Sequence, residues 1–248
     1  MSADPRYFFI HVMKTAGTSL VSDLKKTFPD EQIYPHRTLD KSDPADVEPY
    51  TNIADLIAIS PERRAAIRVY AGHFPYMVSQ MMGIDFATLT LLRDPVERTV
   101  SVLKQFKRLT ERLQASTLEE IYDDEFTFRH FVHDHQTKVF SLTPEDNPRA
   151  ILRAIDVDEH RLAAAKANLE TVDVIGLTER YPAFIEELRS RFGWWPNGLD
   201  QPARTNVSSE SWAVDESLRQ RIALDNAIDM EFYDYARRLV DERAATRS

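Results

Sequence analysis

Residues 7–20 read YFFIHVMKTAGTSL, and this stretch decides the fold. Its first part, 7–12, is mostly apolar and rich in aromatic and branched side chains, which is typical of a buried parallel strand. A turn containing a glycine follows at 13–18, and helical spacing begins near Ser19 and continues to about Phe28. A strand, a loop and a helix in this order form half of a βαβ unit.

The same alternation continues along the chain. Further apolar runs predict strands at 67–71, 86–92 and 172–177, and helical spacing predicts helices at 53–59, 96–109, 118–140, 159–169, 181–192 and 215–243. We expect a surface excursion at 29–48 and a loop at 144–148. Buried strands alternating with helices indicate an α/β fold, with a parallel sheet covered by helices on both faces. Since neither a linker nor a repeat interrupts the pattern, we predict a single domain over residues 1–248.

Composition limits the classes of partner. The chain has 248 residues, is 43% hydrophobic and carries a net charge of −9, which argues against a nucleic-acid polymer as the main partner. It has no cysteine, so disulfides and thiolate metal sites are excluded. We find no signal peptide and no apolar stretch near the ~20 residues of a membrane span. A soluble, cytoplasmic protein is therefore expected.

The loop after the first strand has the parts of an anion site. Anions bind where backbone N–H groups of a tight loop meet the start of a helix. Here Gly17 serves the turn, Thr15, Thr18 and Ser19 offer hydroxyls, and Lys14 offers a positive charge. The nucleotide-triphosphatase pattern G-x-x-x-x-G-K-[ST] is absent, because the lysine precedes the glycine, and no acidic strand end suggests a magnesium ligand. The loop predicts a metal-free phosphate site, with an ordinary turn and a solvated lysine as the alternative.

Two more polar side chains follow ends of predicted strands. His73 comes after 67–71, and Arg93 comes directly after 86–92. Ligands of open α/β sheets bind beyond the carboxyl ends of the strands. We therefore expect Lys14, His73 and Arg93 to converge on one crevice.

Four segments, in order, resemble PAPS-dependent sulfotransferases, in particular the heparan-sulfate 2-O-sulfotransferase-like carbohydrate enzymes and their bacterial relatives. FIHVMKTAGTSL at 9–20 resembles the 5′-phosphosulfate loop of this family, and LLRDPVERTVS at 91–101 its 3′-phosphate segment. HQTK at 135–138 resembles a Q-T-R element, and IGLTER at 175–180 followed by RFGW at 191–194 resembles the later region. Met13 stands where the family usually has proline, and Lys138 where it usually has arginine.

The resemblance implies a sulfotransferase-type, P-loop-like fold and a set of roles. It assigns Lys14 to the 5′-phosphosulfate of the donor PAPS, near the oxygen that bridges to the leaving nucleotide PAP. Arg93 and Ser101 are assigned to the 3′-phosphate. The 5′-phosphate falls to Thr15, Ala16, Gly17, Thr18 and Ser19. The alternatives are an ion pair of Arg93 with Asp94 or Glu97, and a plain helix-surface hydroxyl at Ser101.

The acceptor hydroxyl needs a general base, and neutral histidine suits this role near pH 7. We predict His73, with His11 as the second choice and a packed or capping histidine as the alternative. A metal site at His130, His133 and His135 is disfavoured, so no metal is expected. The acceptor is expected to be a carbohydrate, or else a small hydroxylated metabolite or lipid; the sequence does not predict the oligomeric state. A non-catalytic nucleotide-binding module and a P-loop-like kinase remain as other functions.

Overall fold

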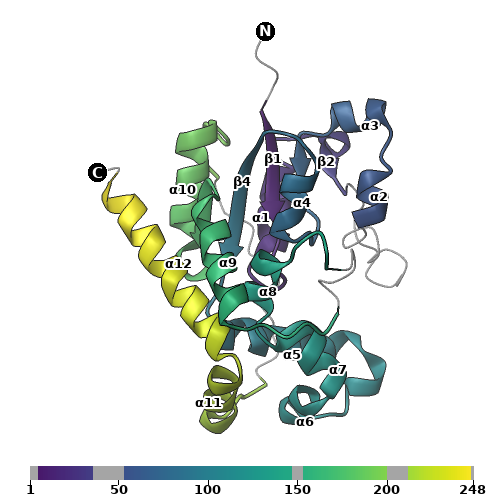
Figure 1. Cartoon of the computed structure of the whole chain (residues 1–248), viewed down its shortest axis with the longest axis vertical. Helices are drawn as coiled ribbons and strands as arrows, with labels where there is room; N and C mark the ends of the chain where they lie inside the picture. The colour runs from purple at the N-terminus through teal and green to yellow at the C-terminus, as the bar shows by residue number, and fades with distance from the viewer. Residues whose placement is uncertain (1–4, 36–52, 147–152, 200–211, 247–248) are drawn as a thin grey trace.

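The computed structural model describes residues 5–35, 53–146, 153–199 and 212–246. Its centre is a five-stranded, all-parallel sheet in the order β2-β3-β1-β4-β5 (Figure 1). The strands are β1 (Arg6–Ile10), β2 (Ile33–Tyr34), β3 (Val69–Tyr70), β4 (Phe86–Leu92) and β5 (Val174–Leu177). This arrangement confirms the predicted α/β class.

The strand order creates a switch point beside β1. The chain leaves β1 for β2 and β3 on one side of it, whereas β4 and β5 lie on the other side. β1 and β4 pair in register from Arg6 opposite Phe86 to Ile10 opposite Thr90. Loops that leave two neighbouring strands in opposite directions open a crevice at their carboxyl ends.

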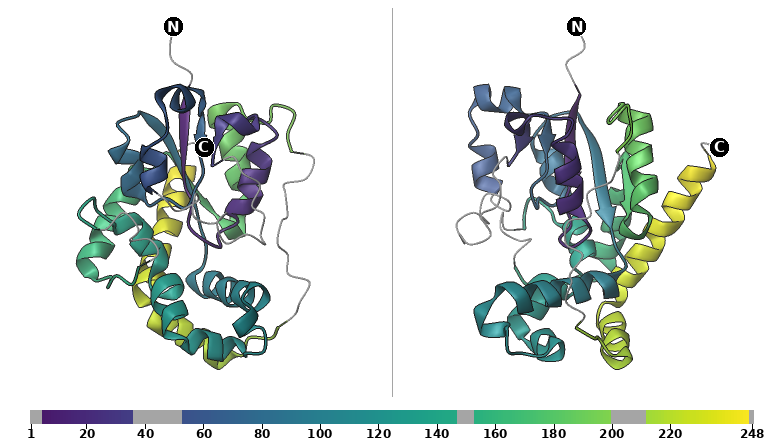
Figure 2. Two further views of the ribbon diagram at one scale, coloured as in Figure 1. Left: turned by 90° about the vertical axis from the view of Figure 1, so that its right-hand side faces the viewer. Right: turned by 180° about the vertical axis from the view of Figure 1, so that it is seen from behind.

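Helices cover both faces of the sheet, seen edge-on in the left view of Figure 2. Alternate side chains of β1 serve the two layers: Phe8 and Ile10 belong to one apolar core, and Tyr7 and Phe9 to the other. The first core is completed by α2 (Ile53–Ile57), α4 (Tyr76–Met81), α8 (His135–Ser141), α9 (Glu159–Glu170) and α12 (Ala227–Ala245). The second is completed by α1 (Gly17–Leu24) and α10 (Tyr181–Phe192).

A third apolar core lies beyond the carboxyl ends of the strands (Figure 1). It is built from α5 (Pro95–Leu109), α6 (Leu118–Asp123), the π-helical turn η5 (Phe128–Val132) and α11 (Glu216–Asp225). The remaining short helices are η1 (Asp30–Gln32), α3 (Pro61–Ala66), η4 (Glu111–Leu113), α7 (Glu125–Thr127) and η7 (Thr178–Arg180).

Two predicted helices are broken in the structure. The stretch 118–140 is divided into α6, α7, η5 and α8, because Asp124 caps a new helix start and Asp134 adopts a left-handed conformation with φ 43°. The stretch 215–243 is divided into α11 and α12 at Asn226, where φ is −118° and ψ is 39°. The break at Asp124 is capped locally, whereas the breaks at Asp134 and Asn226 are stabilised by hydrogen bonds between these two distant segments, which helical spacing alone does not predict.

Among the described residues, the sequence analysis missed the strand β2, the α-helices α3 and α4, and the single-turn helices η1, η4 and η7. Within the expected excursion at 29–48, the structure has η1 and β2, and residues 36–48 lie outside the described part of the chain. Of the predicted loop 144–148, residues 147 and 148 likewise lie outside it. None of the described helices is both long and apolar enough to cross a membrane.

Candidate functional site

The loop between β1 and α1 is a tight, left-handed turn. Lys14 and Ala16 have φ of 69° and 67°, an arrangement that turns backbone N–H groups toward one concave side. The Ala16 carbonyl accepts bonds from Ser19 N and Leu20 N at 3.0 and 3.2 Å, and the Thr15 hydroxyl donates to the Val12 carbonyl at 2.9 Å. Alanine at the N-cap supplies no capping side chain, so the first turn of α1 presents N–H groups without a side-chain acceptor from that position.

Gly17 has a different role from the one predicted. The positive φ angles of the loop belong to Lys14 and Ala16, not to the glycine. A Cβ at Gly17 would lie 1.8 Å from Nε2 of His11 and 2.2 Å from its Cδ2. The glycine is therefore required because the imidazole of His11 packs directly on the start of α1.

The rings of His11 and His73 are in contact, with their centroids 4.0 Å apart and their planes tilted by 35°. Nδ1 of His73 donates to the carbonyl of His11 at 2.9 Å, and Nδ1 of His11 donates to the carbonyl of Ala71 at 3.2 Å. A carbonyl oxygen only accepts, so both rings carry their proton on Nδ1 when neutral, and each Nε2 keeps its lone pair. His11 is 7% exposed, and its Nε2 faces Gly17. His73 is half-buried.

The electrostatics of this pair favour the neutral form of both rings. Burial lowers the pKa of His73 below 6.5, its bond to the His11 carbonyl opposes this, and the Lys14 ammonium adds to the lowering. Burial and then His73 lower the pKa of His11, with a smaller contribution from Lys14. Lys14 is thus close enough to act on both imidazoles. Near pH 7 both imidazoles are therefore neutral bases beside the Lys14 ammonium.

Arg93 joins the loop to the end of β4. Its Nη1 donates to the carbonyl of Lys14 at 3.4 Å, so the two polar ends of the neighbouring strands meet. Its Nη2 lies 3.8 Å from Glu97, which realises the ion pair considered as the alternative, although Glu97 also pairs with Arg219 at 2.6 Å. Ser101 is half-buried in the second turn of α5. Arg93 is therefore in contact with Lys14, and Lys14 lies close enough to His73 to affect its pKa.

Gln136 is a polar residue at the site to which the sequence analysis gave no role. Its Oε1 accepts from the backbone N–H of Arg93 at 3.1 Å, and its Nε2 donates to the backbone carbonyl of Arg93 at 2.8 Å. The sequence analysis included Gln136 only as part of the HQTK segment at 135–138, which resembles the Q-T-R element of the family. Its partner stands 43 residues away and could not be read from spacing.

Two buried basic side chains, Lys138 and Arg98, donate hydrogen bonds to backbone carbonyls. Lys138 is 1% exposed and donates to the carbonyls of His130 and Arg153 at 3.1 and 3.2 Å. Burial lowers its pKa to about 8. Arg98 is fully buried, and its Nη2 donates to the carbonyls of Phe131 and Val132 at 3.0 and 2.8 Å. The Lys138 ammonium therefore links α8 to the backbone at His130 and Arg153.

The three histidines at 130–135 have separate environments. His130 bonds to the carbonyl of Phe126, His133 lies 3.5 Å from Asp134, and His135 is fully buried, where burial lowers its pKa. Among the described residues, no group of three or more metal-ligating side chains is arranged to hold an ion.

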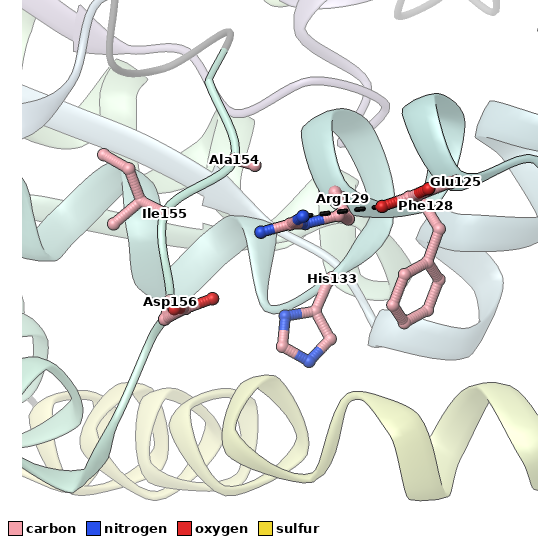
Figure 3. A pocket seen from close by; sticks show the side chains of 7 residues that line it. All are labelled: Glu125, Phe128, Arg129, His133, Ala154, Ile155 and Asp156. Carbon is pink, nitrogen blue, oxygen red and sulfur yellow. Dashed lines mark hydrogen bonds and ion pairs between the residues drawn. The ribbon is translucent and has the colours of Figure 1, made fainter.

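A cavity of about 360 Å³ opens between α7, η5 and the segment 154–156 (Figure 3). An Arg129–Glu125 ion pair of 3.5 Å lies along its wall, with His133 and Asp156 on the other sides. The rest of its lining is Phe128, Ala154 and Ile155. This lining includes none of Lys14, His73 and Arg93, so the cavity is separate from these three residues.

Neither the protein-family models nor the curated proteins contain a match to this chain. The polar stretch 204–209, which could close over a nucleotide, lies outside the described residues.

Proposed function

We propose that this protein is a sulfotransferase that moves a sulfuryl group from PAPS to a hydroxyl acceptor and releases PAP. The observation that carries the proposal is the contact between Arg93 Nη1 and the Lys14 carbonyl. It brings together the loop suited to a 5′-phosphosulfate and the arginine suited to a 3′-phosphate. His73, a neutral base, stands beside the same lysine.

In the proposed reaction the acceptor oxygen attacks the sulfur in line with the bond to the 5′-phosphate oxygen. As the new S–O bond forms, the old one breaks, and the electron pair leaves with PAP. The hydroxyl proton passes to Nε2 of His73, whose lone pair is kept available by the Nδ1–H bond to the His11 carbonyl. Lys14 stabilises the charge that develops on the departing phosphate.

His73 suits the role of base better than His11. Nε2 of His11 is enclosed against Gly17, which leaves no room for a substrate oxygen there. His73 is the more exposed of the two rings, and its Nδ1–H fixes the tautomer in which Nε2 accepts a proton. His11 then acts as the support on which His73 is oriented.

We assign the two phosphates of the donor to different groups of residues. We assign the 5′-phosphate to backbone N–H groups of the left-handed loop, with the exposed hydroxyl of Thr18 beside them. The Thr15 hydroxyl already donates to Val12, so Thr15 contributes through its backbone. We assign the 3′-phosphate to the guanidinium of Arg93, supported by Ser101. This donor site needs no metal ion, and the acceptor we favour is a carbohydrate, followed by a small metabolite or lipid.

Thermal melting with two nucleotides tests the donor. A ligand present at about 100 times its Kd stabilises a folded protein by roughly 2.7 kcal/mol. We expect PAP to raise Tm without magnesium, and ATP with magnesium to have little effect. A shift with ATP and magnesium alone would point instead to a P-loop-like kinase.

Turnover separates an enzyme from a non-catalytic nucleotide-binding module. Labelled PAPS should transfer its sulfuryl group to at least one member of a panel of glycans, phenols and hydroxylated lipids. Binding of PAP without transfer to any acceptor, together with an intact His73, would contradict the catalytic part of the proposal.

A further inference from the structure

The turn between β4 and α5 is held by side chains from two other elements. The carbonyl of Leu92 accepts from the Thr178 hydroxyl at 3.1 Å, and the N–H of Asp94 donates to Glu179 Oε1 at 3.0 Å. Between them, both backbone groups of Arg93 bond to the carboxamide of Gln136. One fully buried side chain thus replaces the strand partner that Arg93 lacks beyond the end of β4.

Gln136 is itself fixed by a carboxylate from α12. Asp229, which is fully buried, accepts from Gln136 N at 3.1 Å, and from both Thr137 N and the Thr137 hydroxyl at 2.7 Å. A carboxylate that accepts several donors at a helix start stabilises that end strongly. The position of the Gln136 backbone is therefore set by α12.

The start of α12 is fixed in return by the start of α8. The N–H of Asp229 donates to Asp134 Oδ1 at 2.9 Å, and Asp134 N donates to Asn226 Oδ1 at 3.0 Å. Each helix N-terminus is thereby capped by a side chain from the other. The buried Arg98 guanidinium lies near this network: burial lowers its pKa to about 10, and the charges of Asp229 and then Asp134 oppose that lowering. This closed network leaves Gln136 little freedom.

The side chain of Arg93 is held more loosely than its backbone. Its contacts to Lys14 and Glu97 are long, at 3.4 and 3.8 Å, and a quarter of the side chain is exposed. The direction of the guanidinium therefore depends on where the backbone of Arg93 stands. That position is set by Gln136.

We propose that Gln136 is a positioning residue that gives the site its selectivity for a nucleotide with a 3′-phosphate, acting through Arg93. This inference rests on the proposed function, since it takes Arg93 as the 3′-phosphate ligand. Gln136 itself touches no substrate. Its loss should weaken binding of adenosine 3′,5′-bisphosphate (PAP) and leave adenosine 5′-monophosphate (5′-AMP), which lacks the 3′-phosphate, nearly unaffected.

Calorimetric titration of the full chain with PAP and with 5′-AMP tests this role. Gln136→Met keeps the side-chain volume and removes both bonds to Arg93. Two neutral hydrogen bonds correspond to roughly a tenfold change in affinity, so we expect Kd for PAP to rise about tenfold and Kd for 5′-AMP to change less than about twofold. Gln220→Met, at an exposed position on α11, is the matched control.

A double-mutant cycle identifies the route of the effect. In an Arg93→Ala background, Gln136→Met should no longer alter the ratio of the two affinities, because the ligand it orients is gone. Gln136→Glu preserves the volume and the acceptor for Arg93 N, and serves in place of methionine if that variant does not fold. It should shift the ratio in the same direction.

The possible failures are distinguishable. If the wild-type protein does not bind PAP, the proposed function is wrong. If the wild type binds PAP and Gln136→Met binds both nucleotides as the wild type does, or loses both equally, then the positioning role is wrong while the donor assignment stands.

Discussion

The loop after β1 and the turn after β4 meet at one edge of the sheet but are held in opposite ways. The loop is fixed mainly by its own neighbours, such as Thr15 on Val12 and Ser19 on Ala16. The turn is fixed by Gln136, Thr178 and Glu179, which stand 43 to 86 residues away. One half of the candidate site is thus encoded locally and the other half by tertiary structure.

Lys14→Ala should have the largest effect, because it removes the positive charge of the locally encoded half. Loss of a single donor aimed at a developing negative charge costs roughly 3–4 kcal/mol of barrier, so kcat should fall by about two to three orders of magnitude. Steady-state kinetics with labelled PAPS measure this loss. Lys25→Ala, which breaks only a partly exposed ion pair with Asp30, should keep normal kinetics. Near-normal turnover of Lys14→Ala would remove it from the mechanism.

Gly17→Ala should have the next largest effect, because it tests how tightly the loop packs on β1. The added methyl group would lie 1.8 Å from His11 Nε2, so the ring or the loop must move. Overpacking of this kind costs about 1–3 kcal/mol, which urea unfolding can measure. In an His11→Ala background the ring is gone and the cost should largely disappear. An equal cost in both backgrounds would show that the glycine serves the backbone and not the contact.

Asp134→Asn should have the smallest effect and concerns the half that is held by tertiary contacts. Burial and then the neighbouring Asp229 raise the pKa of Asp134 above 3.8 in the folded protein. Between pH 3.8 and about 7, the unfolded chain has already lost a proton that the folded chain keeps. Rising pH therefore lowers the free energy of unfolding through this window. Asparagine keeps the acceptor for Asp229 N and removes the charge.

The pH dependence of unfolding distinguishes this effect from the histidines. His11, His73 and His135 have lowered pKa values, so they favour folding as pH rises toward 6.5 and act in the opposite direction. These three histidines are present in both the wild type and Asp134→Asn, so their contributions cancel in the difference in unfolding free energy between the two proteins. Asp134→Asn should gain stability relative to the wild type as the pH rises from 5 toward 7, and the difference should level off above that range. A constant difference across this range would contradict the role given to Asp134.

The features that the sequence predicts correctly are those that depend on neighbouring residues. Apolar runs and their polar ends identified β1 and β4, and the rule for parallel sheets brought Lys14, His73 and Arg93 to one edge. Helix α10 was predicted over 181–192 and is observed as Tyr181–Phe192, since its apolar spacing is regular and a proline stands near its start. Such features depend on residues that are close in the chain.

The features that were missed depend on distant partners. Gln136 and Asp229 lie 93 residues apart, and most of their hydrogen bonds are to backbone groups, which carry no sequence signature. The break at Asn226 has the same origin. The Asn226 side chain accepts a hydrogen bond from Asp134 N, and the helical pattern of the sequence does not show this contact. The role of Gly17 was misjudged because the pattern shows a glycine in a turn and hides the imidazole that packs on it.

The contact between Asp229 and the start of α8 has a consequence for the order in which the protein is completed on the ribosome. The loop around Lys14 has its nearest partners as soon as the first strand and helix have emerged. The turn at Arg93 gains its support only after α12, the last of the described helices, has been synthesised and has docked. A shortened chain that ends before Asp229 would keep the whole loop and lose the carboxylate that aligns Gln136. Selective nucleotide binding would thus report that α12 has docked on the start of α8.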